Sequence, residues 1–211
     1  MKKLKHTIFL IVLSFTLISF KQINDNPGNH PENILISESK KIDINNISTW
    51  YTNYGSFNRD PLTGNSGFEW PKNSGKLARY ASGIWIGGKV GSDTLIAIAE
   101  YSNEFKPGYI QNGIPLGESS PLYKIYSIFR GDTSSSDYMN WPANQGAYLD
   151  SQGKPFFLGT QTSFCSFTDG YVSAHTNRAG STAPLKVDIL QTNWAYTNVN
   201  LQDVIFTEYK I

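Results

Sequence analysis

The residues with the clearest chemical potential are Asp169 and His175, which lie close together in one polar stretch. A histidine beside a carboxylate can move a proton, so a loop that joined these side chains would form an acid–base pair. Solvated loop residues are the commoner explanation. His30 is the only other histidine beyond the first twenty residues, so a metal site made of several histidines is not expected.

The single cysteine, Cys165, is the other candidate nucleophile. It lies within Phe164-Cys165-Ser166-Phe167, a strand pattern in which a free thiol usually packs as a small buried hydrophobe. We therefore predict that Cys165 belongs to the core. One cysteine also excludes an intrachain disulfide, so burial alone must hold the domain together.

Two carboxylates facing each other across a cleft could hydrolyse a glycosidic bond, but the sequence does not pair them. Asp188 and Glu100 alternate out of apolar strand faces, as solvated residues do. Asp150 is a weak candidate calcium ligand, and an ordinary Asx turn explains the same stretch. We expect no catalytic residue, no cofactor and no metal site beyond that candidate. The acidic pool is Glu69, Glu100, Glu104, Asp132, Asp137, Asp150 and Asp169.

The aromatic residues indicate a binding function more strongly than the acidic residues indicate a catalytic one. Trp70-Pro71 and Trp141-Pro142 lie in stretches rich in Gly, Asn and Ser, and Tyr109 follows a Pro-Gly turn. Exposed planar rings stack on sugar or peptide faces, which makes Trp70, Trp141 and Tyr109 the candidate ligand-stacking residues. For the two tryptophans the commoner explanation is that they close the open ends of the fold, because a domain without disulfides needs the large burial energy of aromatic side chains. Trp85 and Trp194 lie inside strand patterns and are predicted to be core residues.

The elements that would position these residues are strands. Residues 94–100 and 186–192 alternate between apolar and polar positions, and turn residues separate such runs throughout. Glycines 87, 88 and 91 with Ser92 and Asp93 predict a hairpin between runs 80–90 and 94–101. The sequence therefore predicts an all-β, antiparallel β-sandwich-like domain over residues 42–211.

The first twenty residues predict export. Lys2, Lys3 and Lys5 precede an apolar run over residues 7–20, as in a signal peptide, and the run is short for a membrane span. No small-residue cleavage box is visible, so an uncleaved anchor stays an alternative. Residues 21–41 are polar and predict a linker. No stable membrane span is expected.

Loss of the leader would leave 15 basic residues against 17 acidic ones. This balance gives no basic patch for nucleic acid or anionic lipid. Residues 204–211 form a well-patterned strand that is followed by no turn or polar tail. We expect that the chain is a truncated part of a longer protein, and the alternative is that a final strand closes the sheet.

The chain resembles the N-terminal region of very large secreted proteins of Bacteroidetes-type bacteria. The resemblance covers about residues 45–211 and rests on the order and spacing of several stretches. They are Asn45-Asn46-Ile47, residues 68–76, residues 81–90, residues 138–142, Gly146, Asp150, Gly153-Lys154-Pro155 and residues 158–162.

The resemblance implies a longer protein with further β-sandwich modules and a C-terminal type IX secretion sorting domain, which these residues do not contain. It implies no catalytic residues. Asp93-Thr94-Leu95 looks like the short acceptor pattern for O-linked glycosylation in such bacteria, which makes Thr94 a candidate modification site.

We therefore expect a non-catalytic, secreted or cell-surface β-module that acts in binding, adhesion or assembly. Its expected partners are extracellular glycans or other surface protein modules. The alternative is the accessory N-terminal domain of a secreted glycan- or peptide-degrading enzyme whose active site lies elsewhere.

Overall fold

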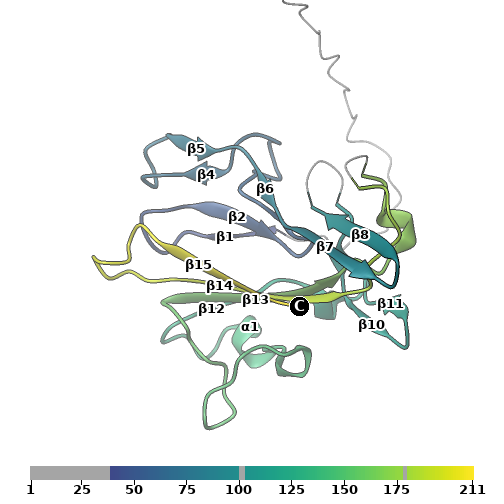
Figure 1. The fold of residues 1–211 in the computed structure, drawn as a ribbon. Coiled ribbons are helices and arrows are strands. Elements are labelled where there is room, and N and C mark those ends of the chain that lie inside the picture. The colour runs from purple at the N-terminus through teal and green to yellow at the C-terminus, as the bar shows by residue number, and fades with distance from the viewer. Residues whose placement is uncertain (1–38, 100–102, 178–179) are drawn as a thin grey trace, which may run out of the picture. The chain divides into compact units, whose positions relative to one another are not determined.

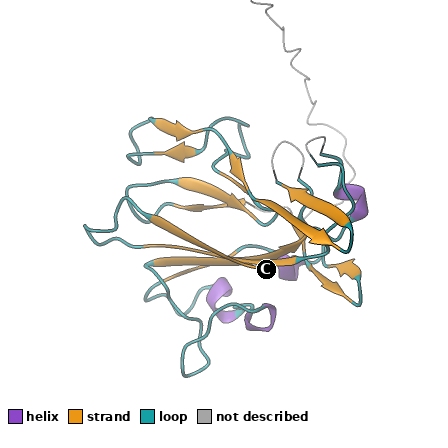
Figure 2. Cartoon of the chain, viewed as in Figure 1, coloured by secondary structure: helices purple, strands orange, loops and turns teal. Residues whose placement is uncertain are grey.

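Two antiparallel layers of strands pack against each other and form a β-sandwich (Figures 1 and 2). The computed structural model describes residues 39–99, 103–177 and 180–211. The predicted signal peptide, most of the predicted linker and Glu100 lie outside these residues. Among the described residues, no helix is long and apolar enough to cross a bilayer.

The larger layer is a sheet of order β12-β13-β14-β15, with the short β9 pairing the far end of β13. Adjacent strands are antiparallel, and β13 and β14 pair over their whole length. The strands are β9 (Lys106–Pro107), β12 (Tyr126–Phe129), β13 (Gln161–Thr168), β14 (Asp188–Ala195) and β15 (Ile205–Lys210).

The second layer consists of a sheet of order β1-β2-β3-β6 and the hairpin β7-β8. β1 begins at Ser39, inside the end of the predicted linker. Figure 1 shows this layer above the larger sheet. Its strands are β1 (Ser39–Ile42), β2 (Thr49–Thr52), β3 (Ser56–Phe57), β6 (Ser82–Gly83), β7 (Trp85–Val90) and β8 (Asp93–Ile98).

The core fills the space between the layers. One cluster joins Ala97 and Ala99 to Phe105, Cys165 and Phe167, all of them fully or almost fully buried. A second cluster joins Ile42 and Tyr51 of the smaller sheet to Ala195 of the larger one. The prediction that Cys165 is a core residue is confirmed.

The predicted hairpin is present, with a shorter turn than expected. Val90 pairs with Asp93, so Gly91 and Ser92 alone form the turn, and Gly87 and Gly88 belong to β7. Two further hairpins, β4-β5 and β10-β11, lie outside the two layers. Their strands are β4 (Phe68–Glu69), β5 (Leu77–Arg79), β10 (Tyr109–Gln111) and β11 (Ile114–Leu116).

The β10-β11 hairpin shows why its sequence turns where it does. Asn112 and Gly113 both have positive φ, at 52° and 78°, as a two-residue type I′ turn requires. Glycine adopts this conformation freely, and asparagine tolerates it better than most residues.

A long excursion between β12 and β13 covers the other face of the larger sheet, opposite the smaller layer (Figure 1). Trp141 packs on Phe164, the Gln145 side chain accepts a hydrogen bond from Ser166, and Tyr148 reaches Glu208 on β15. The helical elements are η1 (Pro121–Tyr123), α1 (Ser136–Met139), η2 (Ala143–Gln145) and η3 (Val172–Ala174).

Candidate functional site

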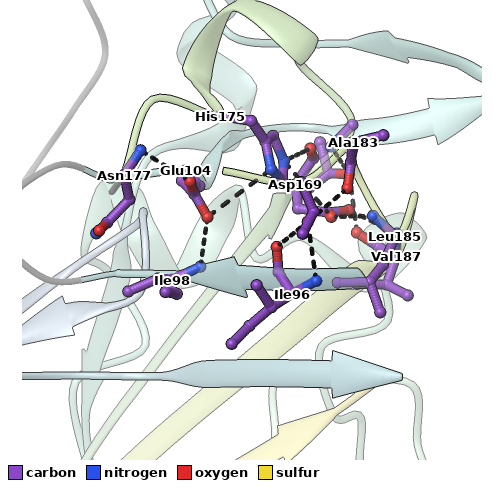
Figure 3. Close-up of polar contacts among 12 residues, drawn as sticks. Ile96, Ile98, Glu104, Asp169, His175, Asn177, Ala183, Leu185 and Val187 are labelled. Carbon is purple, nitrogen blue, oxygen red and sulfur yellow. Dashed lines mark hydrogen bonds and ion pairs between the residues drawn. The ribbon is translucent and has the colours of Figure 1, made fainter. Parts of the chain in front are cut away.

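Asp169 and His175 do come together, but in the interior (Figure 3). The imidazole lies between the carboxylates of Asp169 and Glu104, with Nε2 3.6 Å from Asp169 Oδ2 and Nδ1 3.7 Å from Glu104 Oε2. The His175 side chain is 2% exposed and both carboxylates are 0% exposed. The expectation of solvated loop residues is therefore wrong.

Each carboxylate in this cluster accepts hydrogen bonds from backbone N–H groups. Glu104 accepts from the N–H groups of Ile98 and Asn177, at 2.9 and 3.0 Å. Asp169 accepts from those of Leu185 and Val187, at 2.6 and 2.8 Å. These four bonds tie the segment after η3 to β8 and to the end of β13.

The imidazole is held by the backbone as well, because Nε2 lies 2.8 Å from the carbonyl oxygen of Asp169. A general base must be able to approach a substrate, and a ring buried to this degree beside occupied carboxylates cannot. The cluster is best explained as a structural clamp, since buried carboxylates persist where hydrogen bonds satisfy them.

An open hollow of about 350 Å³ lies at the face of the larger sheet that is turned away from the smaller layer. The predicted stacking residue Tyr109 lines this hollow. The Tyr109 and Tyr123 rings are stacked there, with centroids 5.5 Å apart and planes at 22°. We call this space the tyrosine hollow. Its lining residues are Gly108, Tyr109, Tyr123, Asn144, Gln145, Ser166, Asp188 and Leu190.

The polar groups of the tyrosine hollow are fixed by their own hydrogen bonds. Gln145 accepts from Ser166 Oγ at 3.0 Å and donates to the Leu122 carbonyl at 2.6 Å. The Asp188 carboxylate accepts from the backbone N–H of Ile110 at 2.9 and 3.2 Å. The lining therefore presents amide, hydroxyl and carboxylate groups in set positions.

Glycines let the walls of the tyrosine hollow approach one another. A Cβ atom on Gly117 would lie 2.8 Å from the Tyr123 ring, and one on Gly146 would lie 2.8 Å from Leu190. The pKa of the Tyr123 hydroxyl is raised, mainly by burial and to a smaller extent by the nearby Tyr109 and Asp188. This hydroxyl therefore stays neutral at ordinary pH and can both donate and accept a hydrogen bond.

A second open hollow of about 240 Å³ is lined by the predicted residue Trp141, and we call it the tryptophan hollow. Trp141 is half-buried, and its indole Nε1 donates to the Tyr148 carbonyl at 3.0 Å. Its ring also packs on Tyr126 and Phe164. The lining residues are Tyr138, Met139, Trp141, Ala143, Leu149, Gly153, Lys154 and Pro155.

The third predicted stacking residue, Trp70, lies apart from both hollows. Its side chain is 48% exposed and its Nε1 donates to Asp203 Oδ1 at 2.8 Å. This bond joins the loop that follows β4 to the loop that precedes β15. The structure thus brings Trp141 and Tyr109 to neighbouring hollows and leaves Trp70 elsewhere.

The weaker candidates have simple surroundings. Asp150 Oδ1 accepts from the N–H groups of Gln152 and Lys154, at 2.8 and 2.9 Å, which is an Asx turn. Among the described residues, no group of three or more His, Cys, Asp or Glu side chains is arranged to hold a metal ion. Thr94 is exposed beside the β7-β8 turn.

The prediction for Trp85 is wrong, because its side chain is 55% exposed. Trp85 pairs with Ile98, so both lie on the hairpin face opposite to the one that carries Ala97 of the core cluster, and Ile98 is fully buried there. Gly180 lies against Ile96 and Ile98 and helps to cover them, but Trp85 is left exposed. Trp194 is half-buried and stacks on Phe206, with centroids 5.3 Å apart.

Sequence analysis missed most of the tyrosine hollow. Tyr123 carries a local signal, since Ser120 and Pro121 precede it as a cap and a first helical residue. Asn144 and Gln145 give no such signal. Asp188 was expected to be solvated, but it is half-buried and bonded to Ile110.

The chain is thus an all-β sandwich domain with two aromatic-lined hollows. Comparison with known proteins found no matching family model, no matching curated protein and no matching solved structure.

Proposed function

We propose that this chain is a non-catalytic binding module that acts outside the cytoplasm, and that the tyrosine hollow binds a neutral sugar. One observation carries the proposal: a stacked tyrosine pair lines an open hollow whose other walls are amide, hydroxyl and carboxylate groups. Aromatic rings bind the flat apolar face of a sugar ring, while fixed polar groups bind its hydroxyls.

The charge of the lining supports a neutral ligand. Asp188 is the one ionisable carboxylate among the lining residues, and they include no lysine or arginine. An anionic ligand would meet a like charge without a compensating cation. A sugar hydroxyl both donates and accepts, as do Gln145 and Asn144 through their amides.

The setting of the module is also part of the proposal. The positive and apolar N-terminal sequence supports export, and the resemblance to secreted Bacteroidetes-type proteins supports a place at the cell surface through type IX secretion. Binding of this kind would equally serve the accessory N-terminal domain of a secreted glycan- or peptide-degrading enzyme. Thr94 is the proposed site of O-glycosylation, because it is exposed beside a turn.

The test is a glycan array probed with the full chain, followed by calorimetric titration of each sugar that is retained. We expect Tyr109→Ala and Tyr123→Ala each to weaken binding by about tenfold to a hundredfold, as for aromatic residues at the centre of a site.

Tyr80→Ala is the matched control, because Tyr80 is an exposed tyrosine outside the hollow. It should leave the affinity unchanged. Equal affinity in all three variants, with their folds intact by circular dichroism, would show that sugars bind elsewhere. Retention of no sugar at all would reject the proposed ligand.

A further inference from the structure

The two hollows adjoin each other at η2. Ala143 lines the tryptophan hollow, and the next two residues, Asn144 and Gln145, line the tyrosine hollow. A 3-10 helix rises about 2 Å per residue, so the three residues of η2 extend over only about 6 Å. The two hollows therefore share η2 in their walls, and Ala143 and Asn144 are both exposed at this junction.

We infer that the two hollows are consecutive subsites of one elongated site, and that its ligand is a linear chain of sugar units. This inference rests on the proposed function, because it takes the tyrosine hollow as a sugar site. It adds the tryptophan hollow as a second site and sets the length of the ligand.

Both subsites are preformed, which favours their use by one ligand. In the tryptophan hollow, the bond from Trp141 Nε1 to the Tyr148 carbonyl and the packing on Phe164 fix the indole ring. At the junction, Gln145 is held on one side by Ser166 and on the other by the Leu122 carbonyl. A preformed site loses little conformational entropy when an oligosaccharide binds to it.

The chemistry of the tryptophan hollow suits a further sugar unit. Trp141 and Tyr138 offer aromatic surface, Met139 and Leu149 offer apolar surface, and Lys154 offers donors to hydroxyl groups. A single sugar would fill one hollow and leave the other empty. In a chain, the second unit is already tethered near its subsite, so it binds at high effective concentration.

The experiment compares oligosaccharides of two to six units. The probes are linear β-1,4-glucan, β-1,3-glucan, xylan and mannan fragments, each titrated against the full chain. For the sugar type that binds, affinity should rise at least about tenfold from the shortest to the longest probe, because the second subsite then adds its own contacts.

Variants locate that gain. Met139→Ala and Lys154→Ala change exposed side chains of the tryptophan hollow, and Met139 is 70% exposed, so the fold should tolerate them. Each should remove most of the gain from length and leave the affinity for the shortest probe unchanged. Val199→Ala, at a side chain that is 74% exposed and lines neither hollow, is the control.

The outcomes separate the two ideas. Equal affinity for every length would overturn the elongated site while the sugar-binding function stands. A gain from length that survives both Met139→Ala and Lys154→Ala would also overturn it, because the extra units would bind elsewhere. No binding of any length by the unaltered chain would overturn the proposed function and the inference together.

Discussion

Asp169 uses both of its carboxylate oxygens to hold the backbone. Oδ2 accepts from Leu185 and Oδ1 from Val187, and the side chain is fully buried. Asp169→Asn would replace one acceptor with a donor and leave a buried N–H group unpaired. We expect the free energy of unfolding to fall by about 2 to 3 kcal/mol, measured by urea denaturation.

Asp150→Asn is a matched control for this change. Asp150 accepts both of its hydrogen bonds through Oδ1 alone, from Gln152 and Lys154, and an asparagine keeps that oxygen. Its stability should change by less than about 0.5 kcal/mol. Similar losses in the two variants would mean that the charge of Asp169, and not its second acceptor, is what stabilises the clamp.

Single residues also show where sequence reasoning stops. The local strand pattern was sufficient to predict that Cys165 is buried. For His175 it failed, because the groups that bury it come from segments far away in the sequence, such as Glu104. For Trp85 it failed for another reason. Alternation tells which residues share a face of a strand, but not whether another segment covers that face.

At the scale of elements, α1 protects the edge of the larger sheet. β12 is an outer strand in this sheet, and the Asp137 carboxylate on α1 accepts from the backbone N–H of Ser127 in β12 at 2.9 Å. The same carboxylate pairs with Lys124 and with Lys40 on β1. The Asp137 side chain therefore joins α1, β1 and β12. It also accepts a hydrogen bond from a backbone N–H group that β12 presents at the edge of the sheet.

This contact makes part of the stability depend on pH. Burial raises the pKa of Asp137, but hydrogen bonds from Lys124, Lys40 and the Ser127 backbone outweigh it, and the pKa lies below its ordinary value. A lowered folded-state pKa stabilises the fold above the unfolded pKa, about 3.9, and this stabilisation is lost as pH falls through the folded pKa.

Asp137→Asn should therefore cost about 1 to 2 kcal/mol at pH 7, and the difference from the unaltered chain should shrink below about pH 4. Urea denaturation at a series of pH values measures it. Asp93→Asn, at the exposed first residue of β8, is the control and should follow the unaltered chain throughout. A difference that stays constant down to pH 2 would show that the Asp137 charge is not responsible.

The sequence predicted strands better than it predicted connections. The β7-β8 hairpin was predictable because its two strands are neighbours in the chain, and the same alternation predicted β14. The excursion between β12 and β13 was not predictable, although it supplies all the lining residues of the tryptophan hollow and contributes Asn144 and Gln145 to the tyrosine hollow. Its η2 turn is held by hydrogen bonds to Ser166 and to the Leu122 carbonyl. The local sequence of residues 143–145 does not predict these contacts.

At the scale of the whole described domain, β13 is the central strand that packs against other parts of the fold on both of its faces. All eight of its residues are buried. Cys165 and Phe167 face the smaller layer, where they join its core cluster, and Phe164 and Ser166 face the excursion that carries Trp141. Disrupting β13 would therefore expose both faces at once, so its opening should coincide with global unfolding.

Native-state hydrogen exchange tests this expectation with two contrasting variants. Ile189→Val trims a fully buried side chain of β14 and should lower the free energy of exchange by about 1 kcal/mol throughout β13 and β14. Leu77→Ala, on the exposed strand β5, should lower protection only in β4 and β5. Amides of β13 that exchange as readily as those of β5 would instead mean that the two layers separate before the chain unfolds globally.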